Sequence, residues 1–255
     1  MLLLSTIYHL LSFRVKHARV ASFLVCLAML AGQSCAQTIL FADDFNTPES
    51  YHEALTKNAT TKEYGENALA SGHLLKKWNY SWSYAYDSAW TQAFYVVPDG
   101  KDYMEQAGRS AAPGNYRLVT NTAVPERVKK YEIQFKQRKS DNDPVFFHIG
   151  TDAQGNGGIK FGYENQLPGS DKTVDSVYTR GDLGTTMIPG KAYFRRWAEH
   201  SLTVDVRTKE VTWKVNGEVI LSAQVEQLKP GGHFALSQHY ERGTRYDDVK
   251  IIALE

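Results

Sequence analysis

The sequence predicts an all-β protein, a sandwich or barrel built from short antiparallel strands. Side chains alternate between apolar and polar with a period of two, most clearly over residues 131–138. Asn216-Gly217 separates two such runs and is the strongest short hairpin signal, because both turn residues must adopt positive φ. Glycine-rich stretches at 155–158 and 230–232 mark further turns between strands.

The expected strands lie at both ends of the mature chain and throughout its second half. A helical pattern is weak, and only residues 49–55 could form one or two turns. Residues 62–115 are rich in Tyr and Trp with little alternation, so we expect long loops decorated with short strands. The strands predicted from alternation are 38–45, 131–138, 145–149, 159–163, 201–207, 211–215, 218–221, 233–240 and 245–254.

Residues 1–36 are predicted to be a signal peptide, which leaves 37–255 as a single domain. Basic residues around Arg14 precede an apolar run at 20–31, and Ser34-Cys35-Ala36 supplies the small residues of a cleavage site. A retained membrane anchor is the alternative, although this run is shorter than the ~20 residues of a spanning helix. A lipoprotein anchored at Cys35 is weaker, because Gly32 stands where such a site needs a leucine-like residue.

Removal of residues 1–36 changes the chemistry of the chain. Cys26 and Cys35 leave with the signal, so the mature protein has neither a disulfide nor a thiol. Three basic residues and no acid leave too, and the net charge falls from +1 to −2. A chain with this net charge lacks the excess of positive charge that nucleic-acid binding requires. We expect a secreted or periplasmic monomer with no membrane association after cleavage.

Several segments resemble one known superfamily. Phe41-Ala-Asp-Asp-Phe45 resembles the opening strand of the concanavalin A-like lectin/glucanase jelly rolls, and 216–219, 232–236 and 245–251 resemble their closing strands. The resemblance implies a concanavalin A-like jelly-roll β-sandwich, here with long aromatic-rich loops. The superfamily includes sugar-binding modules, glycoside hydrolases, polysaccharide lyases and adhesion domains, so it supports the fold more than the function.

The residues argue against the hydrolases of this superfamily. Retaining hydrolysis needs two carboxyl groups ~5–5.5 Å apart, and the Glu-x-Asp-x-x-Glu strand that supplies them is missing from the sequence. Polysaccharide lyases need no such pair. They cleave a uronic-acid glycoside by β-elimination, with a base for the C5 proton, an acid for the leaving oxygen and a cation or amide for the carboxylate.

Strand alternation suggests where such groups would lie. If the second-half strands are neighbours in a concave sheet, their polar faces form one groove with His148 and His239 as proton-transfer residues. Tyr163 or Tyr240 would be their partner, although Tyr163 shares its face with Phe161 and so favours a core position. Structural or solvent-facing roles are the alternative for all of these. The substrate-binding residues expected in the groove are Lys136, Arg138, Lys160 and Glu164.

Two further sites are weaker. The aromatic segment 78–90, with Trp82 and Trp90, could stack on sugar rings or could simply pack over the edge of the sandwich. No cofactor is required by this chemistry. A structural Ca²⁺ is possible where Asp44 and Asp248 of the two terminal strands converge. The sequence therefore favours a uronate polysaccharide lyase, and a non-catalytic glycan-binding module or an atypical glycoside hydrolase is the alternative.

Overall fold

A computed structural model of the chain describes most of the residues after 115 and shorter segments before them. The chain divides into two compact units, residues 1–37 and 38–255, and every described strand belongs to the second. None of the described residues forms a helix long and apolar enough to cross a membrane. The described residues are 37–45, 77–82, 93–97, 103–107, 116–139, 144–167, 169–170, 172–191, 193, 195–238 and 244–254.

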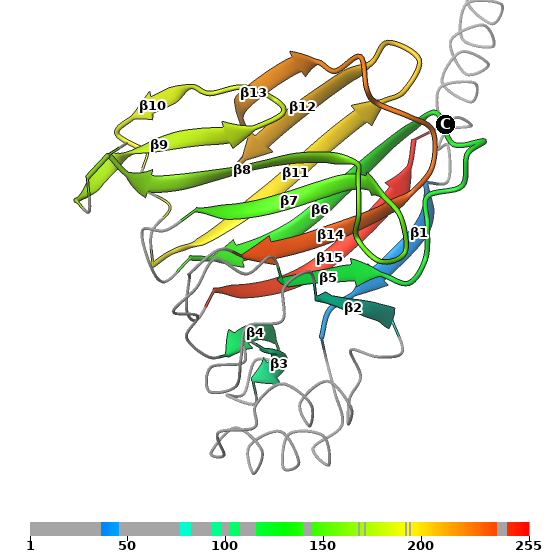
Figure 1. Cartoon of the computed structure of the whole chain (residues 1–255), viewed down its shortest axis with the longest axis horizontal. Helices are drawn as coiled ribbons and strands as arrows, with labels where there is room; N and C mark the ends of the chain where they lie inside the picture. The colour runs from blue at the N-terminus through cyan, green and yellow to red at the C-terminus, as the bar shows by residue number, and fades with distance from the viewer. Residues whose placement is uncertain are drawn as a thin grey trace, which may run out of the picture. The chain divides into compact units, whose positions relative to one another are not determined.

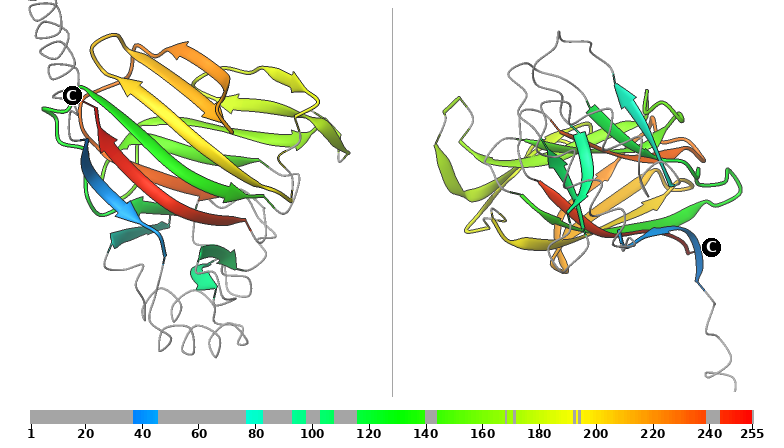
Figure 2. Two further views of the ribbon diagram at one scale, coloured as in Figure 1. Left: turned by 180° about the vertical axis from the view of Figure 1, so that it is seen from behind. Right: turned by 90° about the horizontal axis from the view of Figure 1, so that it is seen from below.

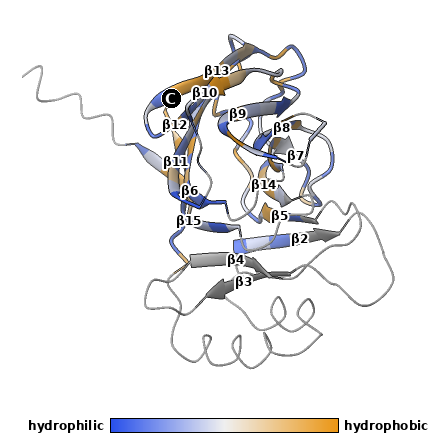
Figure 3. Ribbon diagram, turned by 90° about the vertical axis from the view of Figure 1, so that its left-hand side faces the viewer, coloured by the Kyte–Doolittle hydropathy of each residue, from blue (hydrophilic) through white to orange (hydrophobic). Residues whose placement is uncertain are grey.

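The described strands form two antiparallel sheets that face each other (Figure 1, Figure 3). Sheet I has the order β13-β12-β11-β6-β15-β4-β3, and β1 also pairs with β15. Its strands are β1 (Thr38–Asp43), β3 (Ala93–Val97), β4 (Tyr103–Ala107), β6 (Lys130–Arg138), β11 (Trp197–Asp205), β12 (Glu210–Val215), β13 (Glu218–Gln224) and β15 (Arg245–Ala253).

Sheet II has the order β10-β9-β8-β7-β14-β5-β2. Its strands are β2 (Trp78–Trp82), β5 (Tyr116–Thr120), β7 (Val145–Thr151), β8 (Ile159–Gln166), β9 (Thr173–Gly181), β10 (Met187–Pro189) and β14 (His233–Gln238).

The first and last strands lie side by side in sheet I. Figure 2 shows β1 in blue next to β15 in red, with β6 on the other side of β15. The register joins Thr38 to Ala253 and Asp43 to Val249, so the two ends of the domain close one sheet together. The hairpin expected at Asn216 is present, because β12 and β13 pair on either side of a turn in which Asn216 and Gly217 both have positive φ.

Aromatic rings fill the space between the two sheets. Phe135 of β6 contacts Phe147 of β7 at a centroid distance of 4.8 Å, and Phe161 of β8 meets Trp213 of β12 edge to face at 5.5 Å. His200 of β11 lies among these rings and stacks on Phe135 at 4.7 Å with an interplanar angle of 6°. Edge-to-face and stacked pairs stabilise by about 0.5–1.5 kcal/mol beyond the area that they bury.

Two hydrogen-bonded links join polar groups of this interior. Tyr163 donates to Gln137 Oε1 at 2.6 Å, and the Gln137 amide donates to the Tyr246 hydroxyl at 3.2 Å. The chain of bonds joins β8 of sheet II to β6 and β15 of sheet I. Near the opposite edge, Trp78 of β2 donates to the buried Asp43 of β1 at 2.7 Å. Both links tie the sheets at fixed points, because an unpaired buried polar group would be costly.

The predicted strands are present, and three more were not predicted from alternation. β5, β9 and β10 were missed because each has a short or imperfect alternating pattern. β2, β3 and β4 fall within 62–115, where short strands among loops were expected. The helical turn considered at 49–55 lies outside the described residues.

At Gly162 of β8 the backbones of β7 and β8 approach too closely for a side chain. A Cβ at this position would lie 1.8 Å from Val145 O and 2.9 Å from Phe146 Cα. We expect Gly162→Ala to lower the free energy of unfolding by about 3 kcal/mol, as overpacking does, measured by urea denaturation. Gly157→Ala is the matched control: nothing lies within 4 Å of its Cβ, and only the positive φ should cost about 1 kcal/mol. Equal losses would contradict the close approach.

His200 should make stability depend on pH. Burial lowers the pKa of His200 to about 3, so between that value and about 6.5 the unfolded chain binds a proton that the folded protein excludes. The free energy of unfolding should therefore fall by about 1.4 kcal/mol per pH unit as the pH drops through this window. His200→Phe should remove that part of the slope in urea titrations between about pH 4 and pH 7. An unchanged slope would contradict the buried neutral imidazole.

Candidate functional site

The outer face of sheet II, the face turned away from sheet I, carries the site. Along β7 the side chains of Val145, Phe147 and Ile149 point into the core. Phe146 and His148 therefore point outward, because successive side chains of a strand alternate between faces. The other strands of this part of sheet II, β14, β8, β9 and β5, contribute their outward residues to the same surface.

His148 is at the centre of this face and is only 2% exposed. Its Nε2 lies 2.8 Å from the hydroxyl oxygen of Ser237 on β14. Burial first, and then the charges of Arg117 and Lys160, lower the pKa of His148 to about 3. The imidazole is therefore neutral at physiological pH and has a hydrogen-bond partner.

Lys160 lies directly across from His148 in the register of β8 and β7. Its ammonium group stands 4.0 Å from the ring centroid of Phe146, a cation–π contact. The Phe146 ring can lie there because Gly162 has no side chain, and a Cβ would come 2.9 Å from the ring. Partial burial is the main cause that lowers the pKa of Lys160, with repulsion from Arg117 next.

Arg117 approaches the same centre from β5, where it is paired with Ser237. Its Nη1 donates to the carbonyl of Gly155. Its Nε is buried and has no hydrogen-bond partner among the described residues. Burial lowers the pKa of Arg117, and Asp152 partly offsets this effect. A buried N–H donor that lacks an acceptor destabilises the free protein.

The loop between β7 and β8 folds back over Arg117. Asp152 organises the loop by accepting the N–H groups of Gln154 at 2.9 Å and Asn156 at 2.8 Å. Gly155 has positive φ, and a Cβ there would lie 3.0 Å from Arg117 Cδ. The loop therefore fixes the long arginine side chain against the sheet, which reduces the entropy lost on binding.

Glu164 and Arg180 complete the face on β8 and β9. Arg180 Nη1 lies 3.2 Å from Glu164 Oε2, with the carboxylate buried and the guanidinium half exposed. Glu164 is the one carboxylate on the outward strand positions of sheet II among the described side chains. We call Arg117, His148, Lys160, Glu164, Arg180 and Ser237 together the cationic face.

The structure brings together three of the residues predicted from alternation and separates others. His148, Lys160 and Glu164 share the cationic face, because β7 and β8 are neighbours. Tyr163 is fully buried in the core and donates to Gln137, so a position in the groove was wrong for it. This agrees with the face that it shares with Phe161.

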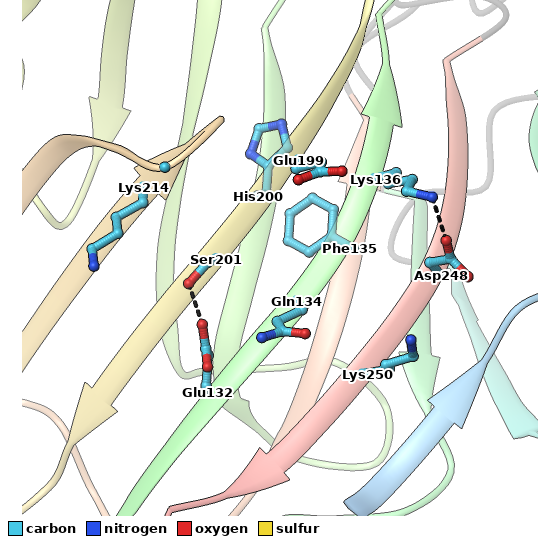
Figure 4. A pocket seen from close by; sticks show the side chains of 11 residues that line it. Glu132, Gln134, Phe135, Lys136, Glu199, His200, Ser201, Lys214, Asp248 and Lys250 are labelled. Atoms are coloured by element: carbon cyan, nitrogen blue, oxygen red, sulfur yellow. Dashed lines mark hydrogen bonds and ion pairs between the residues drawn. The ribbon is translucent and has the colours of Figure 1, made fainter.

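Lys136 and Arg138 were expected in the same groove as His148, and this was wrong. Both belong to β6, which lies in sheet I, so they project from the opposite side of the sandwich. Lys136 lines an open polar groove of about 450 Å³, where its ammonium group pairs with Asp248 at 2.5 Å. Figure 4 shows this ion pair among the residues that line the groove. Lysines and carboxylates balance along this groove, as on an ordinary solvated strand face.

The remaining predicted residues are placed in part. His239, Tyr240 and Trp90 lie outside the described residues, as does the side chain of Trp82 in β2. The possible Ca²⁺ site at Asp44 and Asp248 stays a prediction. Within the described ranges no three His, Cys, Asp or Glu side chains gather as a metal-ion group. Burial, then the neighbouring Asp248, raises the pKa of Asp247 to about 6 at this end of β15.

Sequence reasoning missed Arg117 and Arg180. Arg117 stands in Tyr116-Arg-Leu-Val-Thr120, where Leu118 marks the inward face and so places the arginine outward. Arg180 follows Val177 and Thr179 by the same rule on β9. The run around Arg117 is only five residues long, and the nine-residue run that ends near Arg180 has no regular alternation of apolar and polar residues.

Comparisons with known proteins identify the fold. No family model matches the sequence. The search of curated proteins finds no relative either. Among solved structures, a sialidase has a TM-score of 0.50 at 10% identity, covering 71% of this chain and 17% of its own.

Two other solved structures are similar at lower scores. A Bacillus subtilis protein of unknown function with a galectin-like fold has a TM-score of 0.49 at 10% identity, over 85% of this chain and 96% of its own. Alginate lyase AlyC3 in complex with dimannuronate has a TM-score of 0.45 at 12% identity, over 72% and 92%. The chain has a concanavalin A-like jelly-roll fold.

Proposed function

We propose that the protein binds a uronic-acid-containing polysaccharide on the cationic face and cleaves it by β-elimination. The observation that carries this proposal is the group of three cations, Arg117, Lys160 and Arg180, around the neutral His148. Glu164 is the one carboxylate on the outward strand positions among the described side chains. Asp152 and Asp182 act on Arg117 and Lys160 from the adjoining loops. The jelly-roll fold alone would leave the function open, because it hosts many activities.

The cations suit a chain of carboxylates. Burial lowers the pKa of both Arg117 and Lys160, and each cation further lowers the pKa of Lys160 or His148. All three pKa values are lowered, which means that the protonated forms are disfavoured. An anionic ligand would stabilise the protonated forms and raise these pKa values. Guanidinium groups bind carboxylates through two parallel hydrogen bonds. Perturbed groups of this kind gathered on one face are typical of functional sites.

The elimination chemistry needs a base that is unprotonated at working pH. His148 is neutral, but a pKa of about 3 makes it a weak base in the free protein. An anionic substrate beside it would raise that pKa. The cations would stabilise the negative charge that develops on the uronate when C5 loses its proton. Hydrolysis with two carboxyl groups has no comparable support, because Glu164 lacks a second carboxylate on the described outward positions. His239 or Tyr240 as the acid for the leaving oxygen remains part of the proposal.

A non-catalytic glycan-binding module is the second candidate. His148 and Ser237 are each only 2% exposed and lie within hydrogen-bond distance of one another. A base must come within about 2.6–3.2 Å of the proton that it removes, and this arrangement favours binding without turnover. The two candidates share the cationic face and the uronate ligand, and differ only in chemistry.

Export is part of the proposal. A signal peptide that ends near Ala36 would place the mature protein in the periplasm or outside the cell, where polysaccharides are encountered. The protein would then depend on its core for stability, since both cysteines precede that position.

Turnover can be measured directly. We expect the purified mature protein to generate absorbance at ~235 nm, from the unsaturated product of elimination, with at least one of alginate, polygalacturonate, hyaluronate and heparin. His148→Gln should abolish the signal while leaving binding of the same polymer within about twofold. Binding without absorbance would favour the module, and turnover by His148→Gln would contradict the assignment of the base.

Charge removal distinguishes the two sides of the sandwich. Arg117→Gln should weaken binding of the same uronate polymers at least about tenfold, because it removes a hydrogen bond to a charged group worth about 1.5–3 kcal/mol. Lys136→Gln is the matched control, since it removes a positive charge from the outer face of sheet I. Calorimetric titration of both variants checks the expectation, and equal losses would rule out the cationic face as the binding surface.

A further inference from the structure

The chain contains two Asn-Gly pairs, and their surroundings differ. Asn216-Gly217 closes the hairpin of β12 and β13, whereas Asn156-Gly157 lies in the loop between β7 and β8. Asparagine is a thermolabile residue, because a backbone nitrogen can attack its side-chain amide and expel ammonia. Glycine as the next residue favours this attack, since it has no side chain to shield its nitrogen. The surrounding structure therefore decides which of the two pairs reacts.

We propose that Asn156 is a site of spontaneous deamidation, and that the reaction loosens the loop that holds Arg117. The backbone nitrogen of Gly157 attacks Cγ of Asn156 and forms a bond to it. The bond from Cγ to Nδ2 breaks, and Nδ2 leaves as ammonia with the proton that the Gly157 nitrogen gives up. Water then opens the cyclic imide and leaves aspartate or isoaspartate at this position. Water is the co-reactant, and the reaction needs no oxidant or reductant.

The attacking nitrogen at this pair is accessible. Asn156 and Gly157 are both exposed. Nothing lies within 4 Å of the place that a Cβ of Gly157 would occupy. The N–H of Gly157 has no hydrogen-bond partner among the described residues. The nitrogen can therefore approach the amide without giving up a bond to the protein.

The Asn156 side chain is held by a single contact. Its Nδ2 donates to Asp152 Oδ2 at 3.2 Å, and this hydrogen bond is exposed to solvent. Its Oδ1 has no partner within the described part of the chain. A solvent-exposed contact of this kind contributes little net stability, because water competes for both groups. The side chain can therefore rotate until Cγ meets the nitrogen of Gly157.

Asn216 has the same following residue but is held by a strand. Its Oδ1 accepts the backbone N–H of Glu199 at 2.9 Å, and its own N–H donates to the Glu199 carbonyl at 2.8 Å. Glu199 belongs to β11, which lies between β12 and β6 in sheet I. The Asn216 amide cannot turn toward Gly217 without losing a bond to the backbone of the sheet. We therefore expect Asn216 to remain an amide.

Deamidation at Asn156 removes contacts that shape the loop. Asp152 accepts both the backbone N–H of Asn156, at 2.8 Å, and its side chain. A carboxylate at position 156 has no N–H to donate, and it repels Asp152. Isoaspartate also lengthens the backbone by a carbon atom. The carbonyl of Gly155, which accepts Arg117 Nη1, lies between these two positions and moves with them.

The loss of this loop contact weakens the cationic face, and this step rests on the function proposed for that face. Arg117 is held against the sheet by the loop, which reduces the entropy that it loses on binding. A loosened loop removes that advantage. The new carboxylate also places a negative charge beside a surface that would bind uronates. The affinity for uronate polymers should therefore fall as the protein ages.

Peptide mapping by mass spectrometry tests the chemical step on the folded protein during long storage in mildly alkaline buffer. We expect the peptide with Asn156 to gain the mass of an amide-to-acid exchange and to contain isoaspartate, while the peptide with Asn216 stays unchanged. Gly157→Ala should suppress the change, because a methyl group shields the attacking nitrogen. An unmodified Asn156, or faster reaction at Asn216, would overturn the proposal.

Hydrogen exchange of the backbone amides at 152–156 tests the loosening. Asn156→Asp reproduces the aspartate product, and Gln154→Glu is the matched control, since it adds the same charge to the loop but keeps both Asn156 contacts. Exchange should quicken in Asn156→Asp and in the aged protein, and stay as in the wild type in Gln154→Glu. Equal exchange in the wild type and Asn156→Asp would contradict the loosening, whatever the protein binds.

Uronate binding separates this inference from the function on which its last step rests. Asn156→Asp should bind uronate polymers about twofold to fivefold more weakly than the wild type, as expected for a change in an exposed charge. Deamidation with faster exchange, in a protein that binds no uronate polymer in any form, would support the modification site and reject the function proposed for the cationic face.

Discussion

The aromatic packing between the sheets determines what the outer face of sheet II can present. Phe147 and Phe161 must point inward to meet Phe135 and Trp213. Their neighbours along β7 and β8, His148 and Lys160, are then forced outward and opposite one another. A slip of one residue in either strand would exchange the two sets, burying a charge and exposing the rings. The core thus positions the site.

The cationic face lowers the stability of the free protein. Burial and mutual repulsion lower the pKa of His148 and Lys160, and the buried Nε of Arg117 has no described partner. Each of these features opposes stability in the free protein. A ligand that brings negative oxygen atoms would offset the repulsion that acts on His148 and Lys160. Strain of this kind at a surface with no structural need for it is therefore an argument for a binding role.

Alternation in the sequence predicted which face of a strand a residue occupies, but not which sheet the strand joins. Lys136 and Lys160 both stand at outward positions of well-marked strands, yet β6 and β8 lie in different sheets. Pairing between strands distant in sequence is decided by packing across the whole core, such as the contacts of β15 with both β1 and β6. Local pattern therefore identified His148, Lys160 and Glu164 and misplaced Lys136 and Arg138.

The strand β9 shows how one segment can serve two surfaces. Arg180 points outward toward Glu164 on the cationic face, whereas Asp175 belongs to the set of Val177 and Thr179, which point inward. Beyond the end of the core an inward position no longer meets a packed ring, and Asp175 instead lines a cleft with Lys191 and Glu218. The two surfaces therefore use opposite faces of the same strand, and each can acquire its own charge without disturbing the other.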